Sequence, residues 1–230
     1  STMFSEAFVA TPNTSGWNTS AVTNMSSMFS GTRAANPNTS GWNTSAVTNM
    51  AGMFSGTLVA NPDTSGWSTS AVTDMYSMFA NSSVANPDTR GWDTSAVTDM
   101  TSMFANSDVA NPDTSGWDTS AVPSMYAMFS NAAVAKPDIS GWDVSSVQDA
   151  RYMLTGVTLS TSVYDATLIN WNAQTLQPGV PFSGGNSNYC SSAAVNARAK
   201  LVNSYGWSIT DSGQDCELGE LIFRAGFESE

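Results

Sequence analysis

Hydrophobic and polar positions repeat through the first two thirds of the chain with a period of 25 residues. Tryptophan recurs at this spacing without insertion, and a methionine–phenylalanine pair recurs in the same register. The tryptophan positions are Trp17, Trp42, Trp67, Trp92, Trp117 and Trp142. A fixed period of this length is typical of stacked supersecondary units, each of which buries its hydrophobic face against its neighbours.

The second half of each repeat has the spacing of one helix face. Val47, Met50, Met53 and Phe54 follow one another at intervals of three, three and one residues, which predicts a helix of about two turns over 48–55. Methionine fills irregular gaps between aromatic rings, so we expect a continuous core ladder. The expected core members are the six tryptophans together with Met28, Phe29, Met53 and Phe54.

The first half of each repeat predicts a short strand. It begins with a proline such as Pro37, and Ser40, Trp42 and Thr44 then alternate, which would point the tryptophan inward. Parallel strands stack about 4.8 Å apart, whereas helices need about 10 Å, so the stack should curve gently with its strands on the concave side. The predicted fold is an α/β repeat solenoid, a right-handed coil like that of leucine-rich repeats, with an α+β C-terminal cap.

The period breaks after Met153. The apolar spacing predicts helices over 161–173 and 191–204 and a short strand over 207–209. A cap is expected here, because the last repeat of a stack would otherwise expose core and unpaired backbone. The predicted organisation is a solenoid over 1–156, a cap over 157–216 and a tail over 217–230.

The only two cysteines, Cys190 and Cys216, both lie in the predicted cap. Such a pair in a chain without other thiols predicts one disulfide and an oxidising compartment. Charged residues make up only 11% of the chain, below the usual ~25% of globular proteins, and serine, threonine, asparagine and glycine take their place. These features favour a secreted or cell-surface protein whose signal peptide is removed or omitted.

The net charge of −12 arises from 7 basic and 19 acidic residues, with the basic residues scattered. Nucleic acid binding requires clustered lysine and arginine, so we expect no nucleic acid partner. No apolar run approaches the ~18 residues of a membrane helix, so membrane insertion is not expected either. Histidine, the commonest general base, is absent, and no nucleophile–base pair is recognisable. We therefore predict no catalytic residue and no enzymatic activity.

The string GWDTSAVTDMTSMF at 91–104 resembles the bacterial surface-protein repeat of BspA-like proteins. The resemblance covers 1–154, and 157–216 is similar to the segment that closes such arrays. One departure is a threonine column at 19, 44, 69, 94 and 119, where the family usually has an apolar residue; Val144 keeps the usual type. The resemblance implies a surface location and adhesion, but no particular ligand. We expect the concave sheet, lined by threonine, asparagine and aspartate, to bind a protein or glycan.

An alternative is a structural subunit that binds copies of itself head to tail in an extracellular filament. The chain begins inside a repeat, and its tail carries large apolar residues among acids, so both ends offer contact surfaces. The candidate assembly residues are Met3, Phe4, Phe8, Ile222, Phe223 and Phe227.

Columns of aspartate or asparagine and columns of threonine leave two lesser alternatives. Aspartate or asparagine normally fixes turns, although stacked carboxylates would also suit Ca²⁺, the one cofactor considered. The candidate calcium ligands are Asp88, Asp93, Asp113, Asp118, Asp138 and Asp143. Flat, exposed threonine columns beginning at Thr14 and Thr19 would suit an ice lattice, although β-propensity explains them equally well.

Overall fold

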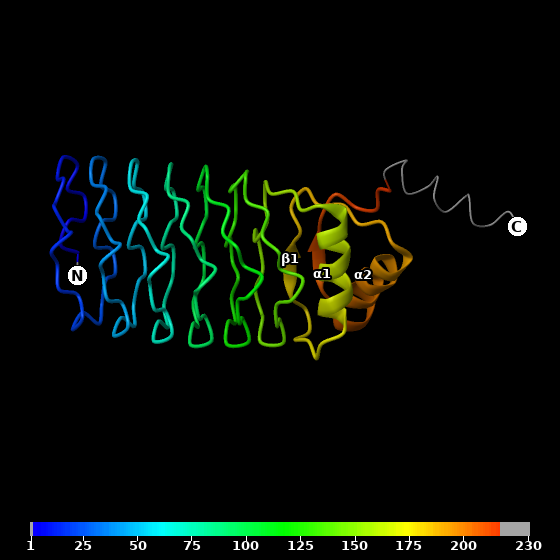
Figure 1. Ribbon diagram of the computed structural model, residues 1–230. Coiled ribbons are helices and arrows are strands. Elements are labelled where there is room, and N and C mark those ends of the chain that lie inside the picture. The colour runs from blue at the N-terminus through cyan, green and yellow to red at the C-terminus, as the bar shows by residue number, and fades with distance from the viewer. Residues whose placement is uncertain (1, 217–230) are drawn as a thin grey trace, which may run out of the picture.

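The computed structural model describes residues 2–216. As far as about residue 157, the chain winds into successive 25-residue coils that lie side by side along one axis, and two helices cover one end (Figure 1). We interpret this stack as a repeat solenoid. The regular elements, all beyond the coils, are α1 (Thr161–Asn172), β1 (Pro181–Ser183), α2 (Ser192–Tyr205) and β2 (Ser208–Thr210).

The helix predicted over 48–55 is wrong, because this segment is a series of turns. The amides of Met50, Gly52 and Phe54 donate to carbonyl groups of the next coil, at 2.9, 2.7 and 2.9 Å. An amide between them, that of Met53, closes a turn onto the carbonyl of Met50 at 3.1 Å. Because alternate amides bond between coils, the continuous i to i−4 pattern of a helix cannot form.

The strand predicted around each tryptophan is also wrong. The amide of Trp42 donates to the carbonyl of Thr39 at 3.1 Å, and the amide of Val47 donates to the carbonyl of Thr44 at 2.9 Å. The tryptophan half of each repeat therefore holds two tight turns, and the β-type pairing between the described coils is limited to isolated parallel bridges such as Asn49 with Asp74. No concave sheet lies along the described coils.

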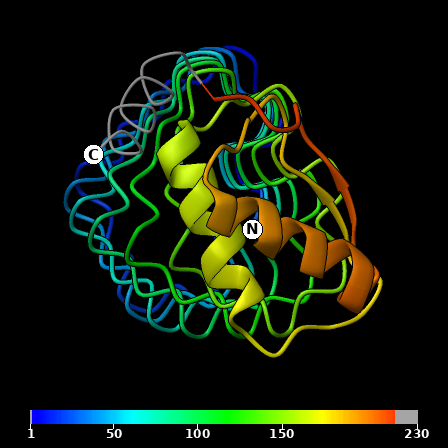
Figure 2. The same cartoon turned by 90° about the vertical axis from the view of Figure 1, so that its right-hand side faces the viewer.

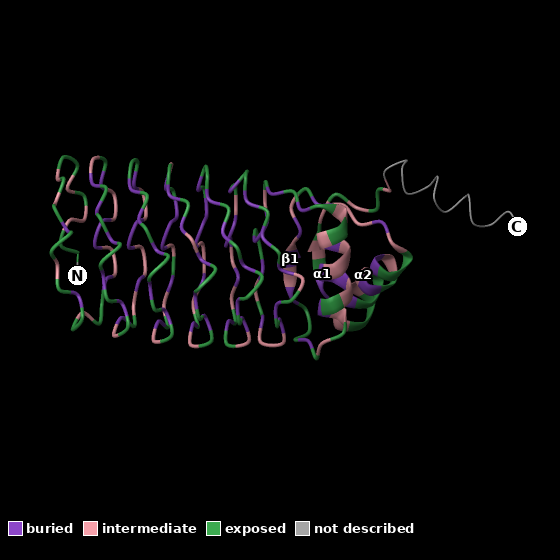
Figure 3. Ribbon diagram, in the orientation of Figure 1, coloured by how far each residue is buried: buried purple, intermediate pink, exposed green. Residues whose placement is uncertain are grey.

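The core is nevertheless a ladder of aromatic rings and methionines, and buried positions recur along the coils (Figure 3). Phe29 stacks on Phe54 at 5.6 Å between ring centroids, and Trp42 stacks on Trp67 at 6.4 Å. The two ladders advance by similar amounts, and no helix widens one side. The stack is consequently close to straight in Figure 1, not curved as expected.

The two threonine columns lie inside the stack, so they do not form the exposed array that ice binding would need. Each hydroxyl donates to a backbone carbonyl of the next coil; Thr39 bonds the carbonyl of Asp63 at 2.7 Å and Thr44 that of Ser68 at 2.9 Å. A buried hydroxyl costs free energy unless it is hydrogen-bonded, and here each hydroxyl links two coils. The column members are Thr14, Thr39, Thr64, Thr89 and Thr114, and Thr19, Thr44, Thr69, Thr94 and Thr119.

The last coil faces the cap, and both columns change there to apolar residues, Ile139 and Val144. Helix α1 lies across this end of the stack (Figure 2). Side chains from α1 and from the residues just after it bond the last coil's backbone. The indole N–H of Trp171 donates to the carbonyl of Ile139 at 3.1 Å. The Gln174 side chain accepts from the amide of Val144 and donates to the carbonyl of Trp142, both at 2.8 Å. The cap thus replaces the hydrogen bonds that another coil would supply.

The predicted cap elements are largely present. Helices α1 and α2 lie within one residue of the predictions, and β2 lies one residue later than predicted. The sequence reading missed β1, which pairs in parallel with β2 and bridges Ala150 of the last coil through Phe182. The backbone pairing of the coils therefore continues into the cap.

Three further contacts hold the cap together. The disulfide between Cys190 and Cys216 is present. The Arg198 guanidinium donates to the carboxylate of Asp211 at 2.8 Å, and the Tyr164 hydroxyl donates to the same carboxylate at 2.8 Å. Burial is the main cause that raises the pKa of Tyr164, so this phenol stays protonated and remains a donor.

Within residues 2–216, no helix has the length and apolar character needed to span a membrane.

Candidate binding face

Three tyrosines, Tyr76, Tyr126 and Tyr152, lie along one side of the stack, on the segments that the sequence predicted as helices. We call this side the tyrosine face; it consists of 26–31, 51–56, 76–81, 101–106, 126–131 and 151–156. Tyr76 is 49% exposed and Tyr152 is 52% exposed, and Tyr152 packs edge to face against Tyr126 at 5.5 Å. These tyrosines were not predicted from the sequence as candidate site residues, although tyrosine in a column of small residues was a visible signal.

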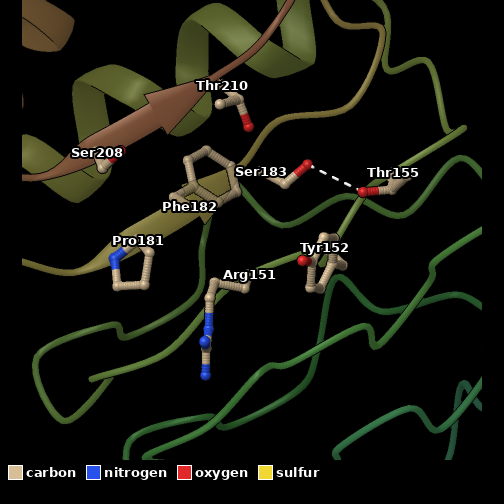
Figure 4. A pocket seen from close by; sticks show the side chains of 8 residues that line it. All are labelled: Arg151, Tyr152, Thr155, Pro181, Phe182, Ser183, Ser208 and Thr210. Carbon is tan, nitrogen blue, oxygen red and sulfur yellow. Dashed lines mark hydrogen bonds between the residues drawn. The ribbon is translucent and has the colours of Figure 1, made fainter.

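A cavity of about 420 Å³ lies on this face where the last coil meets the cap. Its lining comes from the last coil, β1 and β2 (Figure 4). The Thr155 and Ser183 hydroxyls lie 3.2 Å apart within it. The lining residues are Arg151, Tyr152, Thr155, Pro181, Phe182, Ser183, Ser208 and Thr210. The cavity combines aromatic rings, hydroxyls and one guanidinium.

Arg151 is held in place rather than free. Its guanidinium donates twice to the Asp149 carboxylate, at 3.0 and 2.7 Å, and lies 5.6 Å from the centroid of the Tyr126 ring. The Arg151 hydrogen bond is the main cause that lowers the pKa of Asp149, and the same bond raises the pKa of Arg151. Both groups are charged near neutral pH, so the pair adds no net charge to the cavity.

A second cavity of about 410 Å³ lies on the same face toward the N-terminal coils. Its lining includes Ser26, Ala51, Gly52 and Tyr76, from the same columns as the residues of the first cavity. Gly52 has a φ of +60°, and a Cβ there would lie 3.3 Å from the Ser27 hydroxyl oxygen. Small side chains therefore line the second cavity beside the exposed ring of Tyr76, and the exposed ring of Tyr152 lines the first cavity at the other end of the face.

The six candidate calcium ligands fix turns. The Asp93 carboxylate, for example, accepts from the amide of Ser95 at 3.0 Å and from its hydroxyl at 2.6 Å. Asp113, Asp118, Asp138 and Asp143 accept the amide two residues later in the same way, and Asp88 bonds Arg90. Within residues 2–216, no three acidic or thiol side chains gather in a metal-binding arrangement. Calcium binding stays the lesser alternative that it was from the sequence.

These turns predict a pH dependence. The hydrogen bond from the Ser65 hydroxyl is the main cause that lowers the pKa of Asp63, and the Ser95 hydroxyl acts in the same way on the pKa of Asp93. The hydrogen bond from the Arg90 side chain lowers the pKa of Asp88 to about 2. A carboxylate whose pKa is lower in the folded chain binds protons more readily when unfolded. Its stabilisation is complete above the unfolded pKa and is lost as the pH falls through the folded value.

We therefore expect the urea midpoint of unfolding to be level between about pH 7 and pH 5 and to fall between about pH 4 and pH 2. The first coils carry asparagine at Asn13 and Asn38, which does not titrate. Hydrogen exchange should show that the coils with Asp63 to Asp118 lose protection before these coils do. A level midpoint down to pH 2, or equal loss in all coils, would contradict the prediction.

The core residues predicted from the sequence lie together in the two ladders, with Trp17 only half-buried. Of the candidate assembly residues, Phe4 stacks on Phe29 at 5.5 Å, whereas Met3 and Phe8 are exposed. Ile222, Phe223 and Phe227 lie outside the described residues.

No curated protein and no solved structure matches the chain. A family model matches it twice in overlapping register, at 1–114 and 81–178, which together cover all the coils and α1. The overlap is what a repeat-containing family produces on a regular array. The match extends over more than half of the chain, which therefore belongs to the family described as Mycoplasma protein of unknown function, DUF285.

Proposed function

We propose that the chain is a non-enzymatic adhesion module, secreted or displayed at a cell surface, whose tyrosine face binds glycan. The observation that carries the proposal is the cavity lined by Arg151 and Tyr152 at the junction of the stack and the cap. Aromatic rings offer an apolar face to the C–H groups of a sugar ring, and the phenol offers a polar edge. The neighbouring hydroxyls and the fixed guanidinium would bond sugar hydroxyls.

Two features favour glycan over protein as the partner. The cavity adds no net charge, since Arg151 is paired with Asp149. The two cavities repeat the same columns along one face, which would suit an extended polymer that contacts several coils. A stable protein interface buries about 800 Å² per partner around a desolvated apolar centre, and hydroxyl-lined cavities of this size offer a smaller contact.

The surface location rests on other observations. The disulfide favours an oxidising compartment. The resemblance to the BspA-like repeat favours a bacterial surface protein, and membership of a family of unknown function is compatible with this reading. The proposal assigns no catalytic residue and no cofactor.

The alternative is head-to-tail assembly into an extracellular filament. It is supported by the exposed side chains of Met3 and Phe8 at the first coil. It needs an apolar partner surface at the other end of the chain, and the tail residues proposed for it lie outside the described residues. Filaments lengthen with protein concentration, whereas an adhesion module need not assemble.

The tyrosine face is tested on an array of bacterial and host surface glycans. We expect the whole chain to bind a subset of them and Tyr152→Ala to bind the same subset at least about tenfold more weakly, since tenfold corresponds to about 1.4 kcal/mol. Tyr152→Phe keeps the ring and should retain most of the binding. Arrays repeated with a calcium chelator test the calcium alternative. Wild-type binding by Tyr152→Ala would contradict the assignment of the face.

A further inference from the structure

A stripe of exposed apolar side chains runs along the coils, apart from the tyrosine face. The repeat places valine, or once alanine, at one position of each of six successive coils. We call these residues the valine stripe; they are Val9, Ala34, Val59, Val84, Val109 and Val134. The valines are between 39% and 88% exposed, although the chain carries a net charge of −12.

The register of the coils makes this stripe continuous. Two residues beyond each stripe position, the amide of Asn86 donates to the Asn61 side chain at 3.0 Å, and the amide of Asn111 donates to the Asn86 side chain at 2.9 Å. From the second coil on, the residue after each stripe position, such as Ala85, is buried and already supplies the core contact. The valines therefore add nothing to the core, and a contiguous apolar stripe on a polar surface is typical of an interaction site.

The residues one position before each stripe residue indicate which partner fits the stripe. They form a column that consists of Phe8, Arg33, Leu58, Ser83, Asp108 and Ala133. Its only charges are Arg33 and Asp108, which are both exposed. Neither of them forms an ion pair within residues 2–216; Arg33 lies over the Phe8 ring at 4.9 Å. The two charges are opposite in sign. Arg33 lies one coil before Leu58 and Asp108 lies one coil after Ser83, so both are equally far from the midpoint between Leu58 and Ser83.

We propose that the valine stripe binds the valine stripe of a second copy, antiparallel, about a two-fold axis at this midpoint. In that arrangement Val59 meets Val84 of the other copy, and Arg33 meets Asp108 of the other copy, so two ion pairs form. A parallel arrangement in the same register would put this column on opposite sides of the stripe in the two copies, with Arg33 at the level of Arg33 of the other copy, so neither ion pair could form. The charges therefore select the antiparallel dimer.

The dimer would also have a functional consequence. Each copy keeps its own tyrosine face, so a dimer carries two such faces. Two linked sites raise the avidity for a polymer that spans them without any new contact. The dimer itself does not depend on the proposed function, because it rests on different columns of the repeat.

Sedimentation velocity of the whole chain, at several concentrations and physiological salt, tests the dimer. We expect a monomer–dimer equilibrium that stops at two copies. Val84→Asp places a carboxylate at the centre of the stripe and should weaken dimerisation at least about tenfold. Circular dichroism checks that this exposed substitution leaves the fold intact.

Exchanging the two charges distinguishes the antiparallel pairing from nonspecific hydrophobic association. Arg33→Asp and Asp108→Arg alone should each weaken the dimer, because each brings like charges together twice. The double variant restores opposite charges and should recover the wild-type dissociation constant. A wild-type chain that stays monomeric, growth beyond two copies, or a double variant weaker than both single variants would overturn the proposal. Growth beyond two copies would instead favour head-to-tail assembly.

Discussion

Gly185→Ala should be among the most destabilising single substitutions in the chain, lowering the free energy of unfolding by about 3 kcal/mol or more. A Cβ at this position would overlap the carbonyl oxygens of Leu154 and Val157, which belong to the end of the last coil. Neither carbonyl group can shift aside easily, because the backbone on both sides of it is held in place. The residue also has a φ of +65°, a left-handed conformation that alanine adopts only at a cost.

Gly179→Ala is the matched control for this prediction. Gly179 has a similar φ of +71°, but no atom lies within 4 Å of the position that its Cβ would take. It should therefore cost only the backbone conformation, about 1 kcal/mol. Urea unfolding followed by circular dichroism measures both variants. Equal losses would show that the close approach of Gly185 to the last coil does not matter.

Phe79→Ala should lower the free energy of unfolding by about 3–5 kcal/mol, in the range found for large buried aromatic residues. Phe79 is fully buried in the middle of the ladder and stacks on both Phe54 and Phe104, each at 5.6 Å. The resulting cavity would weaken two coil interfaces at once, and the stability of a stack depends on such neighbour contacts.

Phe4→Ala makes the same chemical change at the first coil and is the control. Phe4 is only half-buried and stacks on one phenylalanine of the column, Phe29. We expect a loss less than half that of Phe79→Ala, measured by urea unfolding. A similar loss at both positions would mean that the coils do not share stability through the ladder.

The sequence predicted which residues face the core more successfully than it predicted the backbone that carries them. The inward tryptophans, the methionine–phenylalanine ladder, the helices of the cap and the disulfide could all be read from spacing and composition. The two elements of each repeat could not. Val47, Met50, Met53 and Phe54 have helical spacing, yet alternate amides bond the next coil, and single-chain periodicity cannot reveal bonds between coils.

The candidate surfaces were missed for a related reason. Threonine columns suggest an exposed array, but burial is decided by the turns, and Thr39 and Thr44 prove to be internal links between coils. The columns of Tyr152 and the valine stripe can be aligned from the sequence, but only the turns of the coil show that these positions face outward. The handedness of the coil, the surface location and the absence of enzymatic activity stay predictions.

Isothermal titration calorimetry of two matched arginine variants tests the central claim, that the tyrosine face is the binding site, most directly. Arg151 and Arg90 each bond the aspartate two residues earlier, at 2.7 and 2.6 Å, but only Arg151 lies on the tyrosine face. With the soluble oligosaccharide that binds best on the array, Arg151→Gln should weaken binding about tenfold and Arg90→Gln should leave it unchanged. An equal effect of both substitutions, or no heat of binding with the wild-type chain, would contradict the account.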